Sequence, residues 1–373
     1  MSCPRVEVDL SKIRGNTRTL VERLKGRGIG VTAVTKAVCG HPAIAQAMLD
    51  GGAVSLAEAR LSNVRRLRQA GLTCPITLIR TPLLSQVYGV VQLCDASYNT
   101  EPSVITALAA AALRQGKVHD IFLMVEMGDQ REGIKPSDVG DMARHVVGMP
   151  GVALKGIGAN FACLSGISPT DAKMRALSSL ANAVERQCGA VLRTVSGGNS
   201  ANLPWALEVH ATGRVNDLRI GEAVLLGVDP LTGRQIEGMH RDAFTLVAEV
   251  IEAGAGSARQ FFQNTIGTPA INQLIRNALI NNKIILGLGQ QDIDAAGLLM
   301  PPGVTFIGAT SDHLVIGTRG TPLRVGTEIR FQINYAALMR AMAAPDIQTK
   351  LRDDQPEPPI HKPQGSNRHL ALT

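Results

Sequence analysis

The chain of 373 residues is long enough to form two domains that each bury a hydrophobic core. Charged residues make up 18% of it, and no apolar run approaches the roughly 18 residues that a membrane-spanning helix needs, which argues against a membrane protein. The net charge of +7 is accompanied by only 3% aromatic residues and by no long run of Lys and Arg, so a nucleic acid is not an expected partner.

The N-terminal sequence MSCPRVEVDL carries charges where a secretory signal would be apolar. This pattern predicts a cytoplasmic location, where thiols stay reduced. The six cysteines include no CxxC pair, so we expect neither a disulfide nor a structural metal.

Short apolar runs alternate with helix-like stretches between about residues 30 and 230, as in consecutive βα units of a parallel sheet. The helix-like stretches end at or near a glycine, which suits the end of a helix. Eight units predict a closed (β/α)8 barrel of the TIM type over residues 1–232. The expected strands are 31–36, 53–58, 75–80, 95–99, 120–128, 154–161, 193–198 and 216–222.

The pattern changes after about residue 235 to strand-like runs separated by Gly and Pro turns. A second, β-rich domain is therefore expected over residues 233–345. The tail 346–373 is polar and contains prolines, so we predict that it is flexible. Residues 256–282 fit neither the helix nor the strand pattern.

Active sites of parallel barrels lie at the carboxyl ends of the strands. Lys36 closes the first expected strand and would point its amine into the barrel, although a surface lysine is the alternative. SGGNS (196–200) and RIGE (219–222) end the last two strands with small residues, which is typical of a phosphate site but also of tight turns. A phosphate site beside a lysine amine suggests pyridoxal 5′-phosphate (PLP), whose aldehyde forms a Schiff base with lysine.

Six segments, in chain order, resemble motifs of the alanine racemase family. They are AVTKAVCGH (33–41), VEMGDQREG (125–133), NSA (199–201), LRIGEAVLLG (218–227), SDH (311–313) and NYAALMRAM (334–342). Details such as GDQREG and GQQD are more similar to the ornithine racemase branch. The resemblance implies a PLP-dependent racemase that inverts the α-carbon of a free amino acid by two-base proton transfer.

The resemblance also implies which residues hold the cofactor. Lys36 would form the imine with PLP and act as one of the two proton carriers. The phosphate would be bound by Ser200, by the backbone of Gly221 and Glu222, and by Tyr335.

Arg219 would face the pyridine nitrogen. A guanidinium does not readily give up a proton, so the ring would stay unprotonated and favour return of the proton to Cα over transamination. Arg131 would lie near the substrate carboxylate or the phenolic oxygen, where a planar bidentate donor is useful. Asn160 would lie beside the ring. Structural alternatives stay open: an ion pair for Arg219 or Arg131, and a core position for Tyr335.

Racemisation needs a second proton carrier, which in the family is a tyrosine from the partner subunit. The chain has only three tyrosines, two in the third and fourth barrel units and Tyr335, and the segment that should carry the missing one overlaps 256–282. Cys163, Asp312 and His313 are the titratable residues in matching motifs, and Asp312 is also a candidate for substrate binding. A small buried cysteine and a structural histidine are the alternatives.

The pocket differs from that of an alanine racemase, because Cys39 stands near the position of the family's tyrosine after the lysine. Ornithine or lysine is a plausible substrate, with Glu222 or Asp292 meeting its distal ammonium.

The resemblance implies a homodimer in which each C-terminal domain completes the partner's site. The competing functions are a PLP-dependent amino acid decarboxylase, which would usually have glutamate in place of Arg219, and a non-catalytic PLP carrier, which would lack the second domain.

Overall fold

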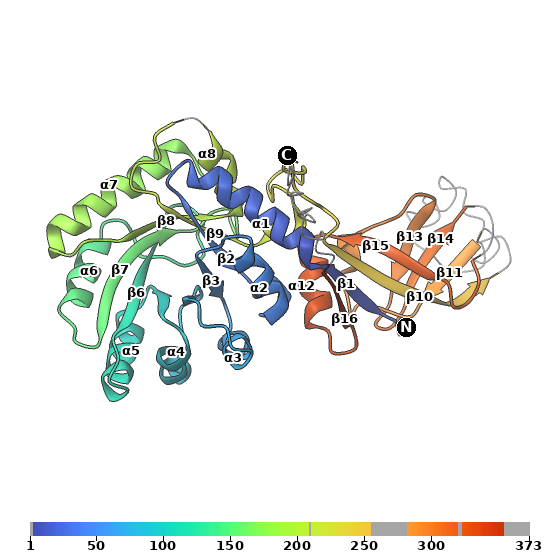
Figure 1. The fold of residues 1–373 in the computed structure, drawn as a ribbon, viewed down its shortest axis with the longest axis horizontal. Helices are drawn as coiled ribbons and strands as arrows, with labels where there is room; N and C mark the ends of the chain where they lie inside the picture. The colour runs from blue at the N-terminus through green and yellow to red at the C-terminus, as the bar shows by residue number, and fades with distance from the viewer. Residues whose placement is uncertain (1–2, 209, 255–281, 320–322, 354–373) are drawn as a thin grey trace, which may run out of the picture.

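The computed structural model describes residues 3–208, 210–254, 282–319 and 323–353. They form a closed parallel barrel and a mostly antiparallel sheet, which lie next to each other along the longest axis of the molecule (Figure 1). The predicted fold class is confirmed. No helix in these ranges is long and apolar enough to cross a membrane.

Eight consecutive strands close the barrel in chain order, and each overlaps one of the apolar runs that predicted it. One boundary differs at the site: the first barrel strand ends at Val34, so Lys36 lies in the 3-10 turn η1 (Lys36–Val38) and not in the strand. The strands are β2 (Gly30–Val34), β3 (Ser55–Glu58), β4 (Ile76–Leu78), β5 (Ala96–Asn99), β6 (His119–Val125), β7 (Val152–Ala159), β8 (Thr194–Asn199) and β9 (Asp217–Ile220).

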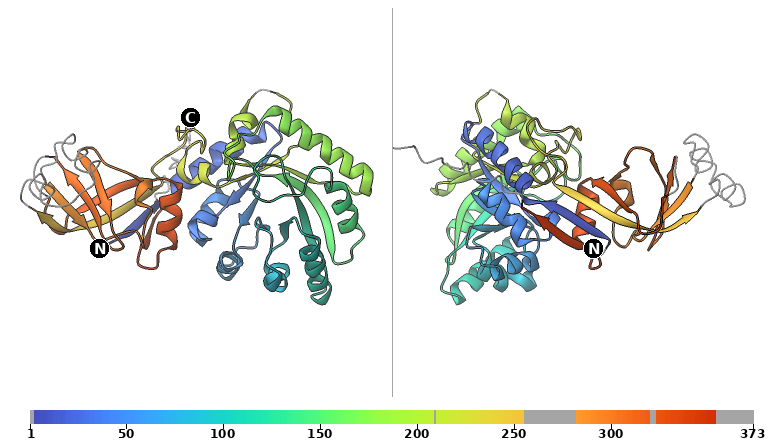
Figure 2. Two further views of the ribbon diagram at one scale, coloured as in Figure 1. Left: turned by 180° about the vertical axis from the view of Figure 1, so that it is seen from behind. Right: turned by 45° about the vertical axis from the view of Figure 1, so that its right-hand side comes forward.

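Helices surround the barrel strands on the outside (Figure 2). Local sequence sets their ends: the Thr170 side chain accepts from the N–H of Lys173 at the start of α7, and Gly189 ends that helix at φ 69°. The helices are α1 (Leu10–Lys25), α2 (Pro42–Asp50), α3 (Leu61–Gln69), α4 (Val87–Leu93), α5 (Pro102–Arg114), α6 (Val139–Val147), α7 (Asp171–Cys188), α8 (Leu203–Leu207) and α9 (Glu222–Leu226), with 3-10 turns η2 (Leu84–Gln86) and η3 (Ser200–Asn202).

The second sheet has the strand order β12-β15-β10-β11-β14-β13, with β1 attached to β10 and β16 attached to β1. Burial alternates residue by residue along β15, as expected for a strand with one face on a core. Its elements are β1 (Arg5–Asp9), β10 (Phe244–Gly254), β11 (Asn282–Leu286), η4 (Ala295–Gly297), β12 (Leu298–Leu299), β13 (Val304–Ala309), β14 (Leu314–Thr318), β15 (Glu328–Ile333), α12 (Tyr335–Ala343) and β16 (Gln348–Arg352).

The two ends of the described chain differ from the prediction. Residues 5–9, assigned to the barrel domain, form β1, which pairs antiparallel with β10 and parallel with β16. The prediction that the tail is flexible from residue 346 is therefore wrong for 348–352, because β16 satisfies its backbone groups on β1 and Ile347 is buried beside it. Residues 354–373, and 256–282 except for Asn282, lie outside the described ranges.

Candidate active site

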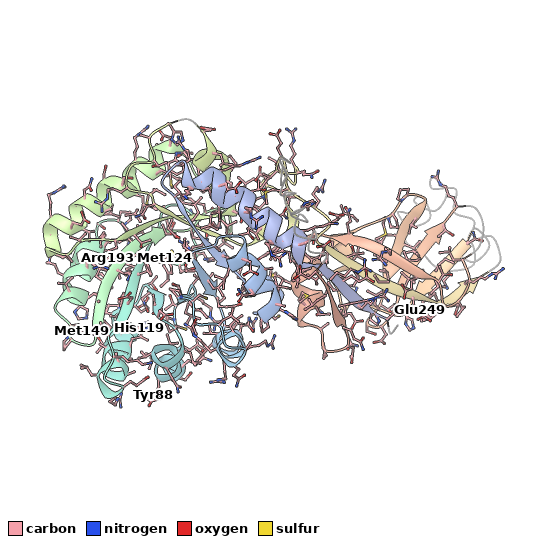
Figure 3. The ribbon with its side chains drawn as sticks, viewed as in Figure 1. Tyr88, His119, Met124, Met149, Arg193 and Glu249 are labelled. Atoms are coloured by element: carbon pink, nitrogen blue, oxygen red, sulfur yellow. The ribbon has the colours of Figure 1, made fainter. Side chains whose placement is uncertain are left out.

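A cavity of about 590 Å³ opens where the barrel strands reach their carboxyl ends. Loops that follow seven of the barrel strands, and the start of α12, contribute its lining. Met124, another lining residue, lies on the barrel side of the molecule in Figure 3, whereas Glu249 lies on the second sheet. The cavity brings together the predicted site residues Lys36, Arg131, Asn160, Cys163, Ser200, Arg219, Gly221, Glu222 and Tyr335.

A buried carboxylate holds the turn that carries Lys36. The Thr35 hydroxyl donates to Oε1 of Glu58 (2.8 Å), while the N–H of Ala59 (2.9 Å) and Nδ2 of Asn63 (3.1 Å) donate to Oε2. Burial raises the pKa of Glu58, although these hydrogen bonds oppose the shift. The Lys36 side chain makes no hydrogen bond or ion pair with the described residues, so its amine is available in the cavity.

The loops after β8 and β9 bring a hydroxyl and backbone N–H groups together. Ser200 is buried, and its Oγ lies 3.4 Å from the backbone nitrogen of Ala223 in α9. Gly221 precedes α9, and a Cβ added there would lie 3.1 Å from Cβ of Val34, so a larger residue would crowd β2. Because the first N–H groups of a helix have no intrahelical acceptor, this junction offers donors to an anion.

Glu222 and Tyr335 lie next to these donors. Burial raises the pKa of Glu222, and the charge of Lys36 opposes that shift. Burial, followed by the Glu222 carboxylate, raises the pKa of Tyr335. The phenol is therefore neutral at physiological pH and can donate a hydrogen bond.

Arg219 lines this cavity and also a second cavity of about 300 Å³. Its Nη1 donates to the Tyr98 hydroxyl (3.1 Å) and to Oγ of Ser196 (2.6 Å), and its Nη2 donates to the carbonyl of Ala159 (2.7 Å). The guanidinium lies over the Tyr98 ring, 4.6 Å from the ring centroid. A guanidinium has five N–H donors. The Nε–H and one N–H of Nη2 consequently have no partner in the described parts of the chain.

Asp129 gathers the loop after β7. Its Oδ2 accepts from Nδ2 of Asn160 (2.8 Å), and its Oδ1 accepts from the N–H groups of Cys163 (2.8 Å) and Leu164 (3.1 Å). Although burial acts to raise the pKa of Asp129, these donors hold it below its ordinary value. The carboxylate thereby fixes Asn160 and Cys163 at the cavity wall.

Arg131 and Glu132 form an ion pair at the cavity. The Nε of Arg131 also lies 4.0 Å from Oδ2 of Asp129. Within the described residues, Glu132 and Glu222 are the two carboxylates that line the cavity. The arginine can accept an α-carboxylate, and a glutamate can accept an ammonium group.

Three predicted residues of the second sheet do not line this cavity: Asp312, His313 and Asp292. Asp312 lies in the turn between β13 and β14, where its carboxylate accepts from Nε2 of Gln291 (2.9 Å). His313 is exposed in the same turn. None of the three therefore contributes to this cavity within one subunit.

Sequence reasoning did not single out five buried polar side chains that support the site: Glu58, Tyr98, Asp129, Ser196 and Asp217. Asp217 had a usable signal, because it stands two residues before Arg219 on one strand and must share its face. The others are identified only by contacts between different strands and loops.

The donor set fits pyridoxal phosphate. An available amine lies at Lys36, Ser200 and the start of α9 offer donors for the phosphate, and Arg219 has two unused N–H groups for the ring nitrogen. The residues present thus match the three functional groups by which the cofactor is held.

Comparison with models of protein families identifies the alanine racemase family. The model described as the N-terminal domain of alanine racemase matches residues 8–230, which includes the whole barrel. The chain is 32% identical to the lysine racemase of Thermotoga maritima over 93% of this chain and 98% of that protein. It is 28% identical to the ornithine racemase of Acetoanaerobium sticklandii over 93% of this chain and 99% of the other.

Solved structures share the fold over nearly the whole length. An alanine racemase from D-cycloserine-producing Streptomyces lavendulae superposes with a TM-score of 0.73 at 18% identity, covering 95% of this chain and 99% of that one. A D-threonine aldolase from Filomicrobium marinum gives a TM-score of 0.70 at 16% identity, covering 92% and 89%. Because proteins with different activities share this architecture, the fold alone does not select the reaction.

Proposed function

The chain belongs to the alanine racemase family and is a PLP-dependent amino acid racemase, and we propose that its substrate is a basic amino acid of the lysine or ornithine type. The observation that carries this proposal is Glu132, a carboxylate that lines the cavity directly after Arg131. We assign the α-carboxylate of the substrate to Arg131 and its distal ammonium to Glu132. Both oxygens of Glu132 accept from Arg131 in the structure, so the substrate would have to replace this ion pair. Two carboxylates were predicted to meet the ammonium: Asp292 does not line the cavity, and Glu222 lines it next to the donors proposed for the phosphate. Neither is assigned to the ammonium.

PLP, when bound, supplies an electron sink that makes the proton on Cα acidic. Racemisation then needs one group that removes this proton and another that returns a proton on the opposite face. We propose that Lys36 acts on one face. Arg219 offers hydrogen-bond donors to the ring nitrogen without an acidic proton.

Cys163 is the proposed carrier for the second face. Of the three candidates, it is the one whose side chain lines the cavity together with Lys36. Its sulfur lies 3.3 Å from Nδ2 of Asn199, and the N–H bonds to Asp129 hold its backbone in place. Asp312 and His313 are proposed to act on the substrate of the partner subunit.

A homodimer is proposed on the basis of the family and of one feature of this chain. Leucines of the loops at the carboxyl end of the barrel are exposed, among them Leu83 (49%), Leu84 (56%) and Leu164 (66%). We propose that a second subunit covers them and that its turn with Asp312 reaches the cavity. The cytoplasmic location stays a prediction from the N-terminal charges.

The test of the substrate uses purified protein loaded with PLP in deuterated water, with L-lysine, L-ornithine and L-alanine supplied separately. Inversion is followed by chiral chromatography and α-proton exchange by NMR. We expect the basic substrates to be inverted at least about tenfold faster than alanine, the effect of one charge-assisted hydrogen bond. Glu132→Gln should remove that preference, whereas the matched control Asp292→Asn should keep it. Equal turnover of alanine and ornithine by the unmodified protein would contradict the proposal.

A further inference from the structure

Arg219 is the first member of a buried chain of hydrogen bonds that ends at Asp217. Oγ of Ser196 accepts from Nη1 of Arg219 (2.6 Å) and donates to Oδ2 of Asp217 (2.5 Å). The other oxygen of that carboxylate, Oδ1, accepts from the Thr32 hydroxyl (2.6 Å). Three barrel strands, β2, β8 and β9, contribute these side chains.

Strand geometry places these hydrogen-bonded side chains inside the barrel. Asp217 and Arg219 are two residues apart on β9 and so point to the same face. Ser196 is the register partner of Asp217 on β8. On the neighbouring strand β7, a Cβ added to Gly158 would lie 3.0 Å from Cβ of Ser196 and 3.0 Å from Cε1 of Tyr98. The absence of a side chain at Gly158 leaves the space that Ser196 and Tyr98 occupy.

The buried charge of Arg219 requires compensation. Its exposed fraction is 4%, and a charge in such a place is stable only when it is hydrogen bonded and paired. Within the described residues, no carboxylate reaches Arg219 directly, and its hydrogen bonds lead through one hydroxyl to Asp217. Burial raises the pKa of Asp217, while the hydrogen bonds from the Ser196 and Thr32 hydroxyls and the charge of Arg219 oppose that shift and favour the carboxylate.

We infer that Asp217 is a positioning residue for Arg219, acting through the Ser196 hydroxyl to fix the guanidinium and to balance its charge from the side away from the cofactor. The inference rests on the proposed function, because it assumes that Arg219 meets the bound PLP. Nη1 is tied to Ser196 and Tyr98, which fixes the orientation of a guanidinium that lines the cavity and has two unused N–H groups within the described residues. A guanidinium without this anchor could turn, and the cofactor ring would lose a fixed partner.

The experiment compares Asp217→Asn and Ser196→Ala with the matched control Thr32→Val. The control removes the hydrogen bond that the Thr32 hydroxyl donates to Oδ1 of Asp217, whereas Ser196 donates to Oδ2. Two readouts besides activity are used: the dissociation constant of PLP, from titration of the visible absorption, and the visible circular dichroism of the bound cofactor, which reports how rigidly the ring is oriented. Melting temperatures of the three apoproteins show whether the variants fold.

We expect Asp217→Asn and Ser196→Ala to weaken PLP binding about tenfold, the effect of one charge-assisted hydrogen bond, and to lose most of the circular dichroism band. Thr32→Val should keep both readouts close to those of the unmodified protein. If Asp217→Asn does not fold, Ser196→Ala decides the test. The inference would be overturned if Ser196→Ala had the same dissociation constant for PLP and the same visible circular dichroism as Thr32→Val. Failure of the unmodified protein to bind PLP would instead refute the proposed function.

Discussion

Lys36 depends for its position on Glu58, a carboxylate that lies outside the substrate cavity. Oε2 of Glu58 accepts from two N–H groups, those of Ala59 and Asn63. In Glu58→Gln, an amide nitrogen replaces one acceptor and leaves a buried donor unsatisfied. We expect the free energy of unfolding to fall by about 1–3 kcal/mol and less PLP to become fixed to Lys36 by borohydride. Urea unfolding measures the first effect. The exposed Glu22→Gln is the control, and an unchanged stability of Glu58→Gln would speak against this role.

Cys163 offers a second test at the scale of single residues. A serine hydroxyl ionises far less readily than a thiol, so Cys163→Ser should slow inversion by about a hundredfold or more, the usual contribution of a positioned acid–base group. Exchange of the α-proton on the face of Lys36 should persist, because that lysine is unchanged. NMR in deuterated water, combined with chiral chromatography, separates exchange from inversion. Cys188→Ser, in α7, is the control; inversion by Cys163→Ser at the unmodified rate would remove Cys163 from the mechanism.

The sequence located the residues that line the cavity better than those that support them. Four of the predicted residues line one cavity, and each lies in a motif of a few consecutive residues: Lys36, Arg131, Ser200 and Arg219. Glu58 acts through partners on other strands and loops, so no local pattern marks it. Ser196 begins the motif SGGNS, but its contacts with Arg219 and Asp217 join different strands and do not follow from that motif. Asp312 and His313 could not be placed by local pattern either, since their position relative to the cavity depends on how the sheet is oriented and on a second subunit.

At the scale of elements, α7 is joined to the loop before β9 by one ion pair. Both Nη atoms of Arg214 donate to the carboxylate of Glu185 (2.8 Å each), and these hydrogen bonds lower the pKa of Glu185 to about 2. The pKa of Glu185 in the folded protein lies below the ordinary glutamate value of about 4.3, so the ion pair stabilises the fold fully above about pH 4.3. This stabilisation is lost as the pH falls towards 2.

Glu185→Gln should therefore lower the free energy of unfolding by about 1 kcal/mol at pH 7, as is usual for a partly exposed pair, and by progressively less between about pH 4 and 2. Urea unfolding at a series of pH values measures the difference. Asp141→Asn, which breaks the more exposed pair with Arg144, is the control and should have a smaller effect. A pH-independent loss in Glu185→Gln would show that the charge of Glu185 does not matter.

The barrel strands were predictable because each is a short apolar run bounded by turn residues. The strands β1 and β16 were assigned wrongly for a common reason. Each gains its backbone partners from a segment far away in the chain, and β16 carries the polar sequence QTKLR directly before a Pro-containing tail. Non-local pairing of this kind leaves no local pattern.

At the scale of the whole molecule, a shared-site dimer predicts complementation. In a mixed dimer of Lys36→Ala and Asp312→Asn subunits, one of the two sites combines an intact Lys36 with an intact Asp312. When equal amounts of the two subunits pair at random, about half of the dimers are mixed, and one of the two sites in each mixed dimer is intact. Mixing the two impaired proteins should thus restore about one quarter of the unmodified activity. Mixing Lys36→Ala with Cys163→Ser is the control and should restore none, because both residues belong to the same barrel. Light scattering that finds a monomer with full activity would exclude the dimer.

The pairing of β1 with β10 and β16 has a consequence for biosynthesis. The first strand leaves the ribosome early, yet its two neighbours are translated only after the entire barrel. Until then β1 has open edges that can recruit strands from other nascent chains. Chains truncated before residue 348 would keep one of these edges open permanently, so C-terminal truncation is expected to reduce soluble yield even where the barrel itself is intact.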